Sequence, residues 1–351
     1  MRLGVFLPTG NDGWISSVNS PHYMPSFELN RSVVSRAEDL GFAFGLGMIS
    51  FRGYGGKTEH WEYTSEPVSQ TAAVLAATGS MQIFASVGVL SLHPAIAARM
   101  AATIDDVAPG RFGINITTGW HRAEYAQMGM WPGDEYFGYR YDYATEWATI
   151  FRELTENGYS DFRGKYFQVD DCRMGMHPKD GIAITAAGAS ERGRRFAAEF
   201  ADYNFTMATD EASISEAQSQ ISASANGRKV GVLSSRTVIL DDTDALARAK
   251  IDYYNEGADV EALNNERGHY VVDSTGTSSS AVAKRFQTHL AINPDAPGLF
   301  AGSPRTIANR LNELAALGGL DGVLFSFDDF GGGLDRFGAE VMPLLDFDIR
   351  G

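Results

Sequence analysis

The stretch that decides the fold lies in the first third of the chain and runs MQIFASVGVLSLHPAIAARMAATIDDVAPGRFGINIT over residues 81–117. Its first part, 81–87, is an apolar run of strand length. Pro94 suits the first turn of a helix, which is predicted to run to about Val107, where a Pro-Gly pair stops it. A second apolar strand follows at 111–117. The stretch therefore predicts a complete strand–helix–strand unit.

The same alternation continues on both sides of this unit. Strands are predicted at 3–7, 42–49, 81–87, 111–117, 181–186, 202–206, 230–240 and 322–327. Most are near-continuous apolar runs, as expected for parallel strands that are buried on both faces. No Gly-x-Gly-x-x-Gly follows the first strand, which counts against an open sheet with a dinucleotide-binding half. Eight such units favour an α/β fold of the closed (β/α)8 TIM-barrel type, with insertions.

Two stretches interrupt the alternation. Residues 120–139 are rich in aromatic residues, glycine and proline, and residues 257–302 are polar and include TGTSSS at 275–280. Insertions of this length form a lid, an oligomer contact or a tolerated surface excursion, and the sequence leaves these alternatives open. We expect one barrel domain over 1–351 with an insertion at about 257–302, which permits a homo-oligomer.

Charge and cysteine content exclude several classes of protein. Lysine and arginine number 29 against 44 aspartate and glutamate, so the net charge is −15. This charge argues against broad contact with nucleic acid or an anionic membrane. Cys172 is the single cysteine, which excludes an internal disulfide and a cysteine-based zinc cage. We therefore expect a protein of a reducing compartment, most simply the cytoplasm.

Candidate site residues are the polar and aromatic residues that follow the predicted strands, because a barrel of this kind places its active site there. They are Ser50, Ser86, Asn115, Thr117, Thr118, Trp120, Glu124, Ser190, Asp328 and Asp329. The seven histidines are scattered and form no zinc-binding helix motif, so no metal site is expected, although His121 falls near the predicted barrel mouth. There is also no Gly-x-Ser-x-Gly nucleophile motif.

Each candidate has a structural alternative. Asn115 suits a flavin edge, a pyrimidine edge or a dioxygen adduct, but an asparagine here can also satisfy buried backbone groups. Ser190 suits an anion site at a helix N-terminus or a simple helix cap. Glu124 accepts an N–H from a ligand or is a solvated charge. Arg140 suits a phosphate or forms a surface ion pair.

Two further candidates also have alternatives. Tyr141 suits a flat ring or packs a helix on the barrel. Asp328 and Asp329 are followed by three glycines, a pattern that is more typical of a tight turn and helix entry than of a site.

Several motifs together resemble those of the bacterial-luciferase-like flavin monooxygenases. They are RFGIN at 111–115 with Gly119 and Trp120, the segment AGAS at 187–190 with the helix that follows it, and GSP at 302–304. Longer segments resemble the pyrimidine monooxygenases that open the uracil ring. Among them are GGKTE at 55–59, RMAATID at 99–105, WPGD at 131–134 and RYDY at 140–143.

This resemblance implies a two-component monooxygenase, in which a separate NADH-dependent flavin reductase supplies reduced FMN and dioxygen is the co-substrate. It implies flavin contacts at Ile49, Ser50, Asn115, Glu124, Arg140, Tyr141 and Ser190. A dioxygen pocket would be lined by Leu46, Ser86 and Asn115, and Trp120 would wall the substrate side. The catalytic residues expected in this way are Asn115, Glu124, Ser86, Leu46 and Trp120.

Two positions depart from the uracil enzymes, which carry lysine where this chain has Ser50 and threonine where it has Ser86. Loss of a cation beside the flavin changes the charge that the site can stabilise. The expected substrate is therefore uracil, a related pyrimidine or a cyclic amide. The alternatives are a deazaflavin-dependent hydride transferase on the same barrel and a non-catalytic flavin-binding protein.

Overall fold

The computed structural model describes residues 1–188, 190–206, 208–271 and 292–349. The strands are β1 (Arg2–Leu7), β2 (Phe44–Gly47), β3 (Gln82–Gly88), β4 (Phe112–Thr117), β5 (Tyr159–Ser160), β6 (Cys172–Arg173), β7 (Ala183–Ala187), β8 (Tyr203–Phe205), β9 (Gly231–Leu240), β10 (Leu299–Gly302) and β11 (Gly322–Phe327). The helices are α1 (Phe27–Asp39), α2 (Pro67–Ala76), α3 (Pro94–Val107), α4 (Arg122–Ala126), α5 (Tyr136–Asn157), α6 (Glu191–Phe200), α7 (Glu211–Ser224), α8 (Asp244–Glu256), α9 (Val260–Val271), α11 (Pro304–Leu317) and α12 (Phe330–Arg336). A π-helical turn and a 3₁₀ turn follow at 337–344.

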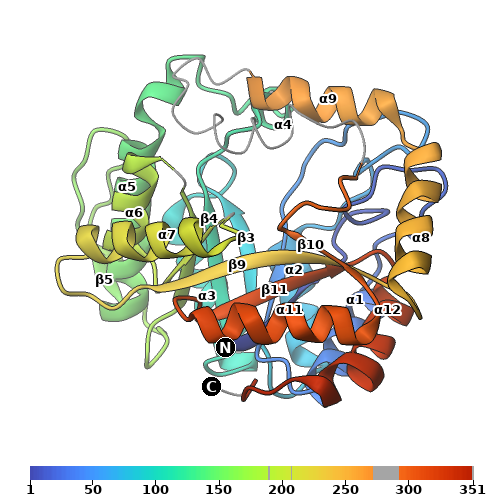
Figure 1. Ribbon diagram of the computed structural model, residues 1–351. Coiled ribbons are helices and arrows are strands. Elements are labelled where there is room, and N and C mark those ends of the chain that lie inside the picture. The colour runs from blue at the N-terminus through green and yellow to red at the C-terminus, as the bar shows by residue number, and fades with distance from the viewer. Residues whose placement is uncertain (189, 207, 272–291, 350–351) are drawn as a thin grey trace.

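The main sheet closes on itself. Its order is β9-β11-β1-β2-β3-β4-β7-β8, and β8 pairs again with β9, always in parallel. Helices surround these strands in Figure 1. All eight predicted strands are present and form the barrel, so the (β/α)8 prediction is confirmed and the open-sheet alternative is wrong.

Local capping explains where several helices begin. Ser190 and Ser303 accept hydrogen bonds from the third backbone N–H of α6 and α11, as N-cap serines do. Asp329 does the same for α12 by accepting from Gly331 N and Gly332 N. The turn-and-helix interpretation of Asp329 is therefore confirmed. At the end of α5, Gly158 takes a left-handed conformation with φ of 69°.

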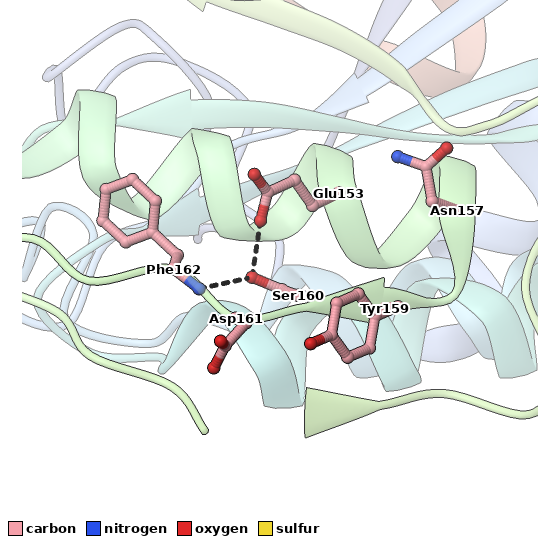
Figure 2. Close-up of a pocket in the computed structure, with 6 residues that line it drawn as sticks. All are labelled: Glu153, Asn157, Tyr159, Ser160, Asp161 and Phe162. Carbon is pink, nitrogen blue, oxygen red and sulfur yellow. Dashed lines mark hydrogen bonds between the residues drawn. The ribbon is translucent and has the colours of Figure 1, made fainter. Parts of the chain in front are cut away.

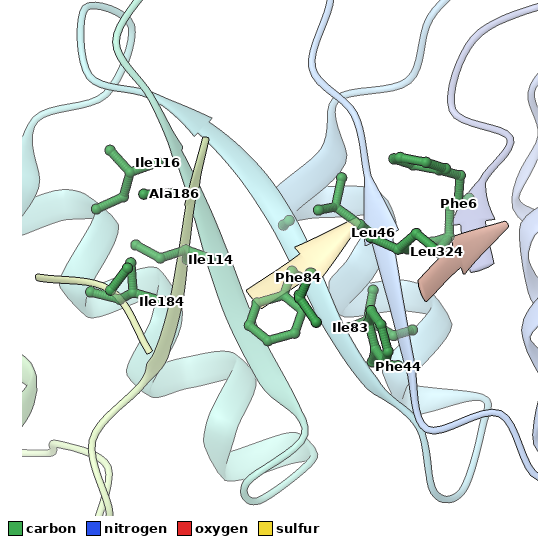
Figure 3. Packing of buried hydrophobic residues seen from close by; sticks show 14 of the residues in the cluster. Phe6, Phe44, Leu46, Ile83, Phe84, Ile114, Ile116, Ile184, Ala186 and Leu324 are labelled. Atoms are coloured by element: carbon green, nitrogen blue, oxygen red, sulfur yellow. The ribbon is translucent and has the colours of Figure 1, made fainter. Parts of the chain in front are cut away.

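Large rings fill the barrel, and contacts between non-adjacent strands identify the inward face. Phe84 on β3 lies 6.2 Å from Tyr203 on β8, and Phe6 on β1 lies 6.1 Å from Phe205 on the same strand, centroid to centroid. Residues two apart on a strand share a face, so the next side chain inward on β3 is Ser86. The opposite faces of the strands pack beneath the helices, and Figure 3 shows one such group of side chains from β4 and β7 gathered together.

The described parts of the segment 257–302 contain α9 and β10, which lie outside the closed ring of eight strands. Within its described part, α9 lies together with α4 at one end of the barrel (Figure 1), and β10 pairs in parallel with the last residues of β9. The polar stretch 275–280 lies outside the described residues. The single-domain interpretation of 1–351, with an insertion at about 257–302, stays a prediction.

No described helix is long and apolar enough to cross a membrane.

A matched pair of glycine variants tests the interior packing. A Cβ atom at Gly113 would lie 2.5 Å from the Phe84 ring, whereas a Cβ at Gly138 in α5 would meet no atom within 4 Å. Gly113→Ala should lower the free energy of unfolding by about 1–3 kcal/mol because the interior has no room for a methyl group. Gly138→Ala should leave it unchanged or raise it by up to about 1 kcal/mol. Urea denaturation measures both, and equal effects would contradict this packing.

Candidate active site

A row of hydrogen-bonded polar side chains crosses three adjacent strands inside the barrel. Ser86 on β3, Asn115 on β4 and Thr185 on β7 stand in register. Asn115 Nδ2 donates to Ser86 Oγ over 2.9 Å, and Thr185 Oγ1 donates to Asn115 Oδ1 over 3.1 Å. All three side chains are buried. The bonds found for Asn115 thus run to side chains rather than to backbone groups.

Two apolar candidates, Leu46 on β2 and Ile49 just after it, belong to the strand next to β3. Leu46 is buried and pairs in register with Phe84, which precedes Ser86 by one inward-facing position on β3. Ile49 is half-buried and follows β2 at the carboxyl end of the strand, where the next residue is the buried Ser50. The predicted pocket residues of β2 and β3 therefore lie on neighbouring strands.

Glu124 on α4 is a second centre of polar contacts. Its Oε1 accepts from Ser50 Oγ over 3.0 Å and from Phe51 N over 3.2 Å. The same oxygen lies 3.3 Å from His121 Nδ1. Glu124 is only 7% exposed, so the alternative of a solvated charge is wrong. None of these contacts uses Oε2, which remains able to accept a hydrogen bond from a ligand N–H.

Aromatic rings surround His121 at the carboxyl end of β4. The His121 ring lies nearly parallel to Tyr54 and Trp120, at centroid distances of 5.9 and 5.4 Å, and 4.0 Å from the His269 ring of α9. His60 in turn stacks on Tyr54. Burial lowers the pKa of His60 to about 4, although Asp12 and Asp259 oppose the shift.

His269 is also held neutral. Burial lowers its pKa to about 4, and the nearby His121 and Arg52 add to the effect. His60 and His269 are therefore neutral near pH 7, and both belong to the group of aromatic rings around His121, beside the carboxylate of Glu124.

The third part of the site is the N-terminus of α6. A Cβ at Gly193 would lie 2.6 Å from Tyr141 Oη, and a Cβ at Gly188 would lie 2.5 Å from the Gly193 backbone. The start of α6 is thus held against the end of β7 and against Tyr141 of α5 by contacts that leave no room for side chains. Arg140, which precedes Tyr141 on α5, is 2% exposed, so the alternative of a surface ion pair is wrong. A buried guanidinium and a helix N-terminus are each groups that can bind an anion.

Two cavities lie at different ends of the barrel. One of about 360 Å³ is lined by Arg52, Arg122, Ala123, Ala126, Gln127 and His269, next to the His121 rings. The other, of about 450 Å³, is formed by the end of α5 and by β5 (Figure 2). Arg152 of α5 bonds to Ile182 O and Asp202, which directly precede β7 and β8, so the second cavity lies at the amino end of the strands. Only the first cavity adjoins the candidate residues.

Comparison with known proteins shows the family to which this chain belongs. The luciferase-like monooxygenase family model matches residues 1–321. The chain belongs to the luciferase-like monooxygenase family. It is 46% identical to a pyrimidine monooxygenase RutA of Bradyrhizobium sp. strain BTAi1, over 98% of this chain and 97% of that protein. A second protein of that name, from Caulobacter sp. strain K31, is 44% identical over 98% of both chains.

Solved structures show the same fold at lower identity. Riboflavin lyase RcaE, solved with modified FMN and riboflavin, matches with a TM-score of 0.81 and 19% identity, over 98% of this chain and 91% of that one. EDTA monooxygenase EmoA from Chelativorans sp. BNC1 matches with a TM-score of 0.77 and 18% identity, over 98% and 93%. This luciferase-like monooxygenase therefore shares its fold with both of these enzymes.

Sequence analysis of this luciferase-like monooxygenase missed two residues of the site. Thr185 lies in a predicted strand. The signal that could have found it is the strand register, which aligns its hydroxyl with Asn115 and Ser86. His269 lies on α9, and no local motif marks it.

The candidate Asp328 is buried and has a structural partner on α8. It accepts a hydrogen bond from Tyr254 Oη over 2.8 Å and pairs with Lys250, which ties α8 to the end of β11. Within the described ranges, no group of three or more His, Cys, Asp or Glu side chains is arranged to hold a metal ion.

The buried histidines predict a loss of stability in mild acid. His60 binds a proton at about pH 4 in the folded state and at about 6.5 when unfolded, so protons favour the unfolded chain between these values. Its contribution to the free energy of unfolding should fall by about 2 kcal/mol from pH 7 to pH 5. Urea denaturation at both pH values measures the change.

His60→Phe provides the control, because it keeps a ring in the stack and removes the titration. From pH 7 to pH 5, this variant should lose less stability than the unmodified protein, by most of the about 2 kcal/mol that His60 contributes. An identical loss in both proteins would show that His60 is not held neutral by burial.

Proposed function

We propose that this chain is a reduced-flavin-dependent monooxygenase that oxidatively opens a nitrogen heterocycle, namely uracil or a related pyrimidine or cyclic amide. The observation that carries the proposal is the buried row of Ser86, Asn115 and Thr185 inside the barrel. Buried hydrogen-bonding side chains are costly unless they serve a packed network or a ligand. This row offers oriented donors beside the apolar residue Leu46, which suits a site for dioxygen.

The flavin is proposed to be FMN, supplied in reduced form by a separate NADH-dependent reductase. Its phosphate would bind at Arg140, Tyr141 and Ser190, since the N-terminus of α6 and the buried guanidinium both carry positive charge. Gly188 and Gly193 let the helix start pack closely against the end of β7 and against Tyr141, because a Cβ at either position would clash. The ring system would contact Ile49, Ser50, Asn115 and Glu124.

The contacts of each side chain support a proposed role. When bound, reduced flavin supplies the oxygen activation. Glu124 Oε1 is occupied by Ser50 and Phe51, so its Oε2 would accept a flavin N–H and fix the ring edge. Asn115 and Ser86 would hold dioxygen through hydrogen bonds at that edge. Trp120, which stacks on His121, would wall the substrate side and exclude water.

The proposed substrate class rests on the relatives and on two side chains. The relatives named pyrimidine monooxygenase match this chain over nearly its full length. Ser50 and Ser86 replace the lysine and threonine implied for uracil enzymes, and Ser50 is bonded to Glu124 rather than contributing a charge. These differences extend the proposal to heterocycles other than uracil.

A hydride-transferring function receives no specific support. An F420-dependent secondary alcohol dehydrogenase shares the fold at a TM-score of 0.71 and 18% identity, and a likeness at that level concerns the fold alone. We therefore propose neither the deazaflavin function nor the non-catalytic one.

Turnover under air tests the proposal directly. The protein is combined with FMN, NADH and a generic flavin reductase, and uracil, thymine, pyridine-type and lactam rings are tested in parallel, with products identified by mass. We expect an oxygen-dependent ring-opened product from uracil or another of these heterocycles. Bound FMN without any oxygenated product would contradict the proposal.

Ser50→Lys tests substrate choice. The variant places an ammonium beside Glu124, where the chain now has a hydroxyl 3.0 Å from the carboxylate. We expect the kcat/KM for uracil to rise relative to that for other heterocycles, by about tenfold if the cation gains one charge-assisted hydrogen bond in the transition state. Ser50→Met is the control for side-chain length without charge. Unchanged preference in Ser50→Lys would show that position 50 does not select the substrate.

A further inference from the structure

Thr185 holds a place in the buried row that the resemblance does not explain. It is fully buried on β7 and lies in register with Asn115. Its hydroxyl has two acceptors in reach, Asn115 Oδ1 at 3.1 Å and Ile114 O at 3.5 Å. The shorter contact makes the Asn115 carboxamide the preferred acceptor.

This preference fixes the direction of the whole row. With Thr185 donating to Oδ1, the amide of Asn115 must donate through Nδ2 to Ser86 Oγ. Ser86 then acts as the acceptor within the row and keeps its own proton. No residue that the structure describes accepts that proton, so the Ser86 hydroxyl ends the row as a donor.

The opposite orientation of the carboxamide would give a different site. If Oδ1 and Nδ2 exchanged places, Ser86 would donate to Asn115, and Thr185 would accept from Nδ2 and donate to the more distant Ile114 O. The free group at the end of the row would then be a lone pair of Ser86 rather than a proton. A reduced form of dioxygen is negatively charged and is stabilised by donors, not by lone pairs.

We propose that Thr185 is a positioning residue that fixes the orientation of the Asn115 carboxamide, so that Asn115 and Ser86 both present hydrogen-bond donors to dioxygen at the flavin. The proposal rests on the proposed function for the identity of the ligand. The orientation itself depends only on side chains of this chain. The orientation of the Asn115 carboxamide and its effect on dioxygen chemistry can therefore be tested separately.

The first experiment uses the protein without flavin. The chain is labelled with ¹⁵N-asparagine, and the side-chain amide signal of Asn115 is assigned by its absence in Asn115→Asp. In the unmodified protein we expect one pair of Asn115 amide protons that exchange slowly with solvent. Thr185→Val should shift this pair, split it into two sets or speed its exchange, and Thr185→Ser should restore it. An unchanged signal in Thr185→Val would overturn the proposal even if the enzyme function is correct.

The second experiment measures coupling of flavin oxidation to product formation. Thr185→Val keeps the side-chain shape and removes the hydroxyl. We expect the fraction of reduced FMN that yields oxygenated product to fall by about tenfold, with hydrogen peroxide formed instead as dioxygen takes both electrons and protons from reduced FMN. KM for the heterocycle should stay within about twofold, and Thr185→Ser should recover the coupling.

Thr155→Val is the matched control. Thr155 is also a fully buried threonine, but its hydroxyl bonds to Phe151 O within α5. We expect no change in coupling or in the Asn115 signal from this variant. Equal uncoupling by Thr155→Val and Thr185→Val, or failure of Thr185→Ser to recover coupling, would reduce Thr185 to a structural role and contradict the proposal. Absence of turnover in the unmodified protein would instead contradict the proposed function.

Discussion

Closure of the parallel sheet between β8 and β9 is the constraint on which the rest of the molecule depends. It brings the carboxyl ends of eight strands to one rim and sets the register in which Ser86, Asn115 and Thr185 meet. A shift of one residue in any of these strands would turn a polar side chain from the interior to the helix layer. The rings of Phe84 and Tyr203 oppose such a shift, because they already fill the interior below the row.

The rim gathers polar groups that are distant in the sequence. Ser50 follows β2 and Glu124 lies on α4, yet they share a hydrogen bond, and His269 of α9 contacts His121 after β4. Each contact restricts a group that would otherwise rotate freely, which is the preorganisation that an oxygenating site needs. Arg140 is buried as well, and water screens a buried charge less than one at the surface.

Much of the fold and part of the site were predictable from the sequence. Strand spacing predicted all eight barrel strands, since buried parallel strands leave near-continuous apolar runs, and Ser303 and Ser190 were recognisable helix caps. Local patterns do not report register, so Thr185 was not singled out beside Asn115. They also do not report burial, which is why a surface role for Arg140 and a solvated one for Glu124 remained open until the structure showed both side chains enclosed. His269 was hidden for a third reason, because it reaches the rim from a helix within the insertion.

Incorporation of ¹⁸O tests the central claim of this account most directly. The enzyme is supplied with reduced FMN and a heterocycle that it opens, under ¹⁸O₂ in ordinary water, and the ring-opened product is examined by mass spectrometry. The account predicts one ¹⁸O atom in the product and none when the label is carried by water instead. A product that forms without dioxygen, or that takes its oxygen from water, would contradict an oxygenating role for the buried row and for the flavin site around it.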